Sequence, residues 1–123
     1  MTNATFCKYW LAHFAKDIPK TDIKNYVTAT GNYIWHIFSW KLLDDACYLT
    51  GNAAKAAYDK VDKADAVYVD QFHGSTVKVL EPRLHTAAAL DAITEVYVAP
   101  RDFSWTYIKT HEDSCGPYFM KRL

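Results

Sequence analysis

Two pairs of strand-like segments in this sequence follow each other so closely that no helix fits between them. Segment 66–69 is followed by 76–81, and segment 95–98 is followed by 104–110. Neighbouring parallel strands need a crossover of a dozen or more residues, whereas antiparallel neighbours need only a short turn. The spacing therefore disfavours a doubly wound parallel sheet and favours a mixed one.

Helical periodicity fills much of the remaining chain. The first stripe of apolar residues has the spacing i, i+3, i+4, i+7, i+11 and consists of Cys7, Trp10, Leu11, Phe14 and Ile18. Residues 19–29, 51–61 and 82–94 predict three further helices, the last of which starts at a proline. Residues 33–38 are dense in aromatic and β-branched side chains and predict another strand, buried on both faces.

The order of these segments predicts the fold class. Helices precede and interrupt the strands, which is typical of an α+β fold. We expect a mixed β-sheet of about five strands with three to four helices packed on it. The chain has 123 residues, a length that fits one domain, so we expect residues 1–123 to form a single globular unit without a linker.

Charge and hydropathy narrow the range of partners. Lys plus Arg is 14 and Asp plus Glu is 14, so the chain lacks the basic surplus that nucleic acids and anionic membranes attract. No apolar run approaches the roughly 20 residues of a membrane helix. We therefore expect neither a nucleic-acid nor a membrane partner, and we expect weak self-association because a neutral chain repels its copies little.

Cysteine usage and the N-terminal segment predict the compartment. The three cysteines are Cys7, Cys47 and Cys115. An odd and widely spread set is a poor disulfide framework, so we expect free thiols in a reducing cytoplasm. Lys8 and Lys16 interrupt the N-terminal segment before an apolar stretch of signal-peptide type develops.

The common catalytic and cofactor motifs are missing. The sequence contains no Gly-x-Gly-x-x-Gly, Walker, Gly-x-Ser-x-Gly or Cys-x-x-Cys motif. His111-Glu112-x-x-Cys115 imitates a zinc-binding helix, but Gly116-Pro117 directly after it disfavours a helix. We therefore assign no catalytic residue, cofactor or metal ligand from the sequence and lean against an enzyme.

The C-terminal block is the main candidate for a functional surface. It combines large aromatic rings with ionisable groups in Trp105, Tyr107, Thr110, His111, Glu112 and Tyr118. Tyr and Trp beside polar groups are enriched at protein interfaces. The preferred hypothesis is a non-enzymatic module that binds a protein partner through this aromatic face, which predicts an exposed apolar patch near Trp105 or Tyr118.

Three alternatives stay open for the same block. The first is an enzyme in which His111 acts as acid or base, Glu112 orients it, and Tyr107 or Tyr118 contacts the substrate. The second is a small-molecule sensor with a pocket between helix and sheet. The third is structural: Thr110, His111 and Glu112 would then bond backbone groups that a turn leaves open.

The block also carries a family resemblance. Residues 102–112 and 115–119 contain Trp-Thr-Tyr, Thr-His-Glu and Gly-Pro-Tyr-Phe in this order, and segments 35–39, 51–58 and 95–98 add weaker support. This pattern resembles a small bacterial domain of unknown function, the family numbered 4275. The resemblance implies a single-domain cytoplasmic protein of bacterial origin and implies no activity.

Overall fold

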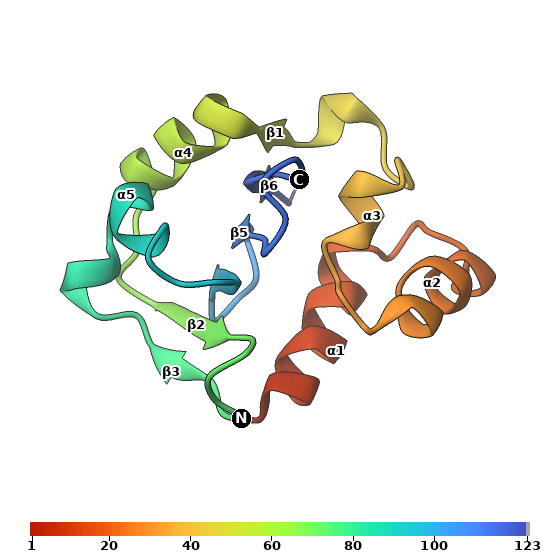
Figure 1. Cartoon of the computed structure of the whole chain (residues 1–123), viewed down its shortest axis with the longest axis horizontal. Helices are drawn as coiled ribbons and strands as arrows, with labels where there is room; N and C mark the ends of the chain where they lie inside the picture. The colour runs from red at the N-terminus through yellow and green to blue at the C-terminus, as the bar shows by residue number, and fades with distance from the viewer. Residues whose placement is uncertain (123) are drawn as a thin grey trace.

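The computed structural model describes residues 1–122, and the expected α+β class is confirmed. In this described part of the chain, six strands form one sheet in the order β1-β6-β5-β4-β2-β3 (Figure 1). Their bounds are β1 (Leu49–Thr50), β2 (Ala66–Asp70), β3 (Lys78–Val79), β4 (Val96–Pro100), β5 (Trp105–Lys109) and β6 (Tyr118–Lys121). Every neighbouring pair is antiparallel, so the sheet is not the mixed one that we expected.

Within residues 1–122, five α-helices and three 3₁₀ helices pack around the sheet. The α-helices are α1 (Asn3–Phe14), α2 (Lys20–Tyr26), α3 (His36–Ser39), α4 (Gly51–Lys60) and α5 (Ala87–Leu90). The 3₁₀ turns are η1 (Thr28–Thr30), η2 (Asp45–Cys47) and η3 (Pro82–Leu84). Among residues 1–122, no helix combines the length and the apolar character that crossing a membrane demands.

The sheet is covered on both faces. Along β4, Val96 and Val98 belong to the core beneath α4 and α5, whereas Tyr97 and Ala99 belong to the core beneath α1 and α3. This alternation follows from the two-residue period of a strand. Figure 1 shows α4 and α5 on one side of the strands and α1, α2 and α3 on the other.

Helix α1 docks on the centre of the sheet. The Thr2 side chain caps it by accepting a hydrogen bond from the Thr5 backbone N–H at 3.1 Å. Its buried face carries Phe6, Trp10 and Phe14, and burial of such side chains contributes roughly 1.5–3 kcal/mol each. The Trp10 indole N–H donates to the hydroxyl of Thr106 on β5 at 2.8 Å, which fixes the helix against that strand.

The strand predicted over residues 33–38 is wrong. The chain makes a turn there and continues into α3, with the His36 N–H donating to the Tyr33 carbonyl at 3.1 Å. Ile34, Ile37 and Phe38 are buried at the spacing i, i+3, i+4, which is helical. The dense apolar content therefore reflects a short helix that inserts into the core.

Two further segments differ from the expectation. The helix predicted over residues 82–94 is divided into η3 and α5, because Thr86 adopts an extended conformation and caps a new helix by accepting from the Ala89 N–H. The aromatic tail after residue 117 is the strand β6, which pairs with β1 and β5. Because residues 33–38 are not a strand, β6 and the short strand β1, which was also not expected, together bring the sheet of the described residues to six strands.

Candidate functional site

The aromatic side chains of the C-terminal block lie inside the protein. Trp105, Tyr107 and Tyr118 are buried, and so is Thr110. The expectation of an exposed apolar patch at Trp105 or Tyr118 is wrong, because β5 lies inside the sheet and helices cover both of its faces. Tyr107 stacks on Tyr58 of α4, with ring centroids 4.5 Å apart.

Only His111 and Glu112 of the candidate residues reach the surface. The structure joins His111 to Glu95, a residue that sequence reasoning did not select. Antiparallel pairing of Val96 with Lys109 brings the end of β5 beside the start of β4, so the residues just outside these positions meet. The available signal in the sequence was a lone acidic residue at the edge of the apolar segment 96–99.

Glu95 is fully buried and surrounded by hydrogen-bond donors. Its Oε1 atom accepts from Trp35 Nε1 at 3.0 Å, from His111 Nδ1 at 2.7 Å and from the His111 backbone N–H at 3.2 Å. Its Oε2 atom accepts from the Tyr97 hydroxyl. A buried carboxylate is tolerated only when such partners replace its hydration. Glu95 therefore anchors three aromatic side chains at once.

The contact with Glu95 fixes the orientation of the His111 ring. A carboxylate oxygen can only accept a hydrogen bond, so the Nδ1 atom carries a proton. The Nε2 atom faces Glu112, whose Oε1 atom lies 3.8 Å away. The His111 side chain is 28% exposed and that of Glu112 is 54% exposed, so this second nitrogen lies at the protein surface.

Aromatic rings flank the His111 imidazole. The Tyr33 ring centroid is 5.0 Å from it and the Phe72 centroid is 5.5 Å from it. Phe72 is 46% exposed, an unusual value for a phenylalanine. We define the His111 surface as Tyr33, Phe72, His111, Glu112 and Asp113.

The charges near this surface are mainly negative. Glu112 and Asp113 are exposed, whereas the Lys109 ammonium group donates to the backbone carbonyls of Ile93 and Thr94 at 2.6 and 3.2 Å.

The buried Glu95 carboxylate also affects the ionisation of a thiol in the protein interior. Burial, and then the Glu95 carboxylate, raises the pKa of the Cys7 thiol to about 11.

The segment that imitates a zinc helix is a turn. The Cys115 N–H donates to the Glu112 carbonyl at 3.0 Å, and the Thr110 hydroxyl lies within hydrogen-bond distance of the Glu112 and Cys115 carbonyls. Thr110 thus bonds backbone groups of the turn as the structural alternative predicts, but that alternative is wrong for the other two side chains, because His111 bonds the Glu95 carboxylate and Glu112 faces the His111 ring. In the described part of the chain, no three His, Cys, Asp or Glu side chains converge as a metal site requires.

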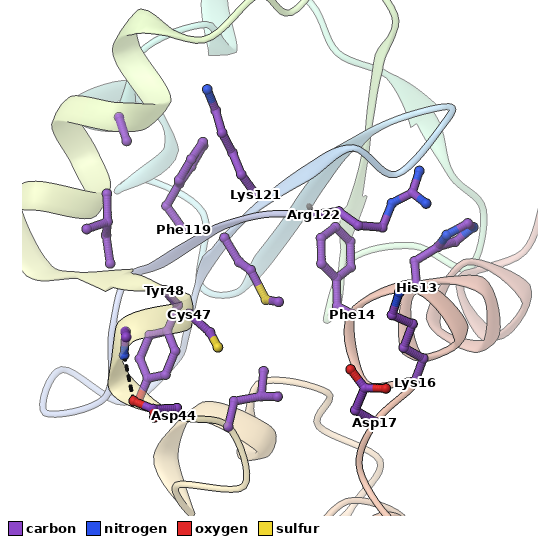
Figure 2. Close-up of a pocket in the computed structure, with 15 residues that line it drawn as sticks. His13, Phe14, Lys16, Asp17, Asp44, Cys47, Tyr48, Phe119, Lys121 and Arg122 are labelled. Atoms are coloured by element: carbon purple, nitrogen blue, oxygen red, sulfur yellow. Dashed lines mark hydrogen bonds between the residues drawn. The ribbon is translucent and has the colours of Figure 1, made fainter.

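Two hollows lie away from His111. The first, of about 710 Å³, separates the end of α1 from η2 and β6. Figure 2 shows Cys47 and Tyr48 on the opposite side of it from His13 and Phe14. The second, of about 910 Å³, lies between α1 and α2. His111 lines neither of these two hollows.

Comparison with known proteins identifies the family alone. Neither the curated proteins nor the solved structures contain a significant match to this chain. A family model, described as "Domain of unknown function (DUF4275)", matches residues 2–119. The resemblance of the C-terminal block to this family is thereby confirmed. The chain belongs to the family of domains of unknown function DUF4275.

Proposed function

We propose that the chain is a non-enzymatic binding module that recognises a basic segment of a protein partner with the His111 surface. One observation carries the proposal: a buried carboxylate holds the His111 imidazole at 2.7 Å, between Tyr33 and Phe72. Side chains that are already fixed lose little conformational entropy on binding, and this is the property of an interface anchor.

The chemistry of the His111 surface favours arginine or lysine in the partner. The rings of Tyr33 and Phe72 can receive a cation over their faces, an interaction worth about 0.5–1 kcal/mol at exposed sites. The exposed carboxylate of Glu112, 3.8 Å from the His111 Nε2 atom, adds complementary charge, and the exposed Asp113 is the next residue in the chain. Arginine suits both the rings and the carboxylates, because its guanidinium group stacks on rings and pairs with carboxylates.

An array of short peptides tests this proposal. The labelled protein should be enriched on peptides rich in arginine or lysine. Substitutions Phe72→Ala and Glu112→Lys should each reduce this binding at least fivefold. Tyr9→Ala is the matched control, because Tyr9 is a similarly exposed ring that lies beside Phe103, ahead of β5, whereas His111 follows that strand. Enrichment of acidic peptides, or equal losses for all three variants, would contradict the proposal.

A second candidate function is acid–base catalysis by His111, with Glu95 as the carboxylate that orients it. It is favoured by the bond from His111 Nδ1 to buried Glu95, which leaves Nε2 to exchange a proton with a bound substrate. The substitution Glu95→Gln separates the two functions. Replacing the carboxylate that orients a catalytic imidazole by an amide can cost about 10⁴-fold in rate, whereas a folded binding surface would change its peptide affinity only a few-fold.

We also propose a cytoplasmic location. The support is that Cys7, Cys47 and Cys115 are all free, as expected where thiols stay reduced. Fractionation of cells of the source species, with an antibody to the chain, tests this directly. Recovery from the periplasm or culture medium would overturn it.

A further inference from the structure

One nitrogen of the His111 ring is fixed in its protonated form, and the other is open to a proton from the solvent. The Nδ1 atom donates to the Glu95 carboxylate at 2.7 Å, so this nitrogen carries a proton for as long as the bond persists. A second proton must therefore enter at Nε2. Glu95 is fully buried and His111 is partly exposed, so the second proton arrives from the outer side of the ring.

The Nε2 atom of His111 faces the exposed carboxylate of Glu112. Its distance of 3.8 Å from Oε1 is longer than a hydrogen bond, which suits two groups that are both acceptors. While the ring is neutral, the Glu112 charge stays available to a partner. A proton on Nε2 converts this nitrogen into a charged donor, and the two side chains then form an ion pair within the protein.

Two neighbouring segments contribute further titratable groups near the ring. The turn before α3 contributes Tyr33 and His36, whose ring centroids are 5.7 Å apart. The end of β2 and the hairpin turn after it contribute Asp70 and His73, and the His73 Nδ1 atom lies 3.1 Å from Asp70 Oδ1. His73 thus has an acidic partner of its own, separate from Glu112.

Strands β4 and β5 and the loop of His111 itself contribute the remaining groups. The Tyr97 hydroxyl donates to the second oxygen of the buried carboxylate, and the Lys109 ammonium group is held by two backbone carbonyls. Asp113 follows Glu112 in the chain, and the Cys115 Sγ atom lies 3.8 Å from Glu112 Oε2. Within residues 1–122, the ion-pairing contact of Glu112 is the one with the His111 imidazole.

We infer that protonation of His111 weakens recognition of a basic segment by the His111 surface, because the same proton adds positive charge there and draws Glu112 into an internal ion pair. The inference rests on the proposed function and adds its regulation. An imidazole changes charge between about pH 5 and about pH 8, a range in which exposed carboxylates stay ionised. The lost attraction is that of one exposed ion pair, so affinity should fall about fivefold from the higher to the lower pH.

Peptide affinity at these two pH values tests the inference. The probe is a labelled arginine-rich peptide with blocked ends and without His, Asp or Glu, so that titration is confined to the protein. Its fluorescence anisotropy should show the weaker binding at the lower pH. Equal affinities, or tighter binding at the lower pH, would overturn the inference and leave the binding function intact. A peptide that binds at neither pH would contradict the proposed function.

Variants assign the pH dependence to one imidazole. In His111→Gln the affinities at the two pH values should be nearly equal, whatever their absolute size. His73→Gln is the matched control, because His73 is also an exposed histidine beside a carboxylate, and it should keep the wild-type ratio. In Glu112→Gln the ratio should be smaller than in the wild type. An unchanged ratio in His111→Gln or in Glu112→Gln would contradict the mechanism.

Ring resonances of the free protein test the same chemistry without a partner. In protein with isotope-labelled histidine, the Nδ1 atom of His111 should carry a proton at both pH values, and Nε2 should carry one at the lower pH alone. A proton on Nε2 at the higher pH would overturn the inference, whether or not a peptide binds. Calorimetry in two buffers of different ionisation enthalpy should also show that peptide binding releases protons, since the effects of two ligands on each other are reciprocal. Proton uptake on binding would contradict the inference.

Discussion

The Nδ1 atom of His111 lies 2.7 Å from the Oε1 atom of Glu95, a carboxyl group without solvent exposure. The pair joins the loop after β5 to the residue before β4. It also ties the protein interior to its surface, because the same imidazole contacts the exposed Phe72. The His111 ring is held in place by Glu95 at Nδ1 and is partly exposed, so it is both fixed and available to a binding partner.

Removal of the Glu95 carboxylate should destabilise the protein strongly. Glu95→Ala leaves the Trp35 indole, the Tyr97 hydroxyl and the His111 ring without their acceptor, and breaking a buried pair from one side costs about 3–5 kcal/mol. Urea unfolding followed by tryptophan fluorescence measures the loss. Glu112→Ala is the exposed control and should change the free energy of unfolding by less than about 0.5 kcal/mol. A loss for Glu95→Ala as small as that of the control would contradict the anchoring role.

Removal of the His111 imidazole should lower the free energy of unfolding by less than removal of the Glu95 carboxylate does. His111→Ala deletes one donor to Glu95 but keeps the backbone donor and Trp35, so the expected loss is about 1–2 kcal/mol. A double-mutant cycle with Glu95→Ala, which removes the acceptor, isolates the pair. The two losses should be non-additive, because each variant removes the same contact. Additive losses would mean that the two side chains do not interact in solution.

The hydrogen bond that the Thr106 hydroxyl accepts should contribute to the stability of the protein. Thr106→Val preserves the volume but leaves the buried Trp10 indole N–H without its acceptor, at a cost of about 1–3 kcal/mol. Thr21→Val is a control on the exposed side of α2 and should be nearly neutral. Chemical denaturation of both variants gives the comparison. A neutral Thr106→Val would show that this hydrogen bond does not hold α1 on the sheet.

The Cys7 thiol should contribute to alkaline unfolding. Burial raises its pKa from 9.0 to about 11, so the folded state prefers the protonated thiol. The resulting stabilisation is fully present below pH 9, the unfolded value, and is lost as the pH rises through about 11. Cys7→Ser should therefore flatten the fall of unfolding free energy over this pH range in reducing buffer. Cys47→Ser, at an exposed thiol, should leave the slope as it is, and equal slopes for both variants would refute the effect.

Local patterns predicted the parts of the fold that depend on them. Helical periodicity predicted α1, in which Trp10 and Phe14 of the expected stripe are buried, and short apolar segments predicted β2, β4 and β5. Residues 33–38 were misassigned because aromatic density is common to buried strands and to short buried helices. The spacing of Ile34, Ile37 and Phe38 carries the distinction.

The candidate site depends on contacts between distant segments, so the sequence revealed only half of it. His111 and Glu112 stand out in a polar and aromatic block, but the partner of His111 comes from the start of β4, through the register of the sheet. In the sequence, Trp105 and Tyr118 were candidates for an exposed surface because they are aromatic residues close to ionisable ones. Their burial follows from the helices on both faces of the sheet, which no local pattern specifies.

The most direct test of the binding function is a titration of the isotope-labelled protein with an arginine-rich peptide, followed by the backbone amide resonances. The account predicts that saturable shifts concentrate at Tyr33, Phe72, His111 and Glu112, and that Glu112→Lys abolishes them. Shifts centred on Tyr9, or absent at saturating peptide, would contradict it.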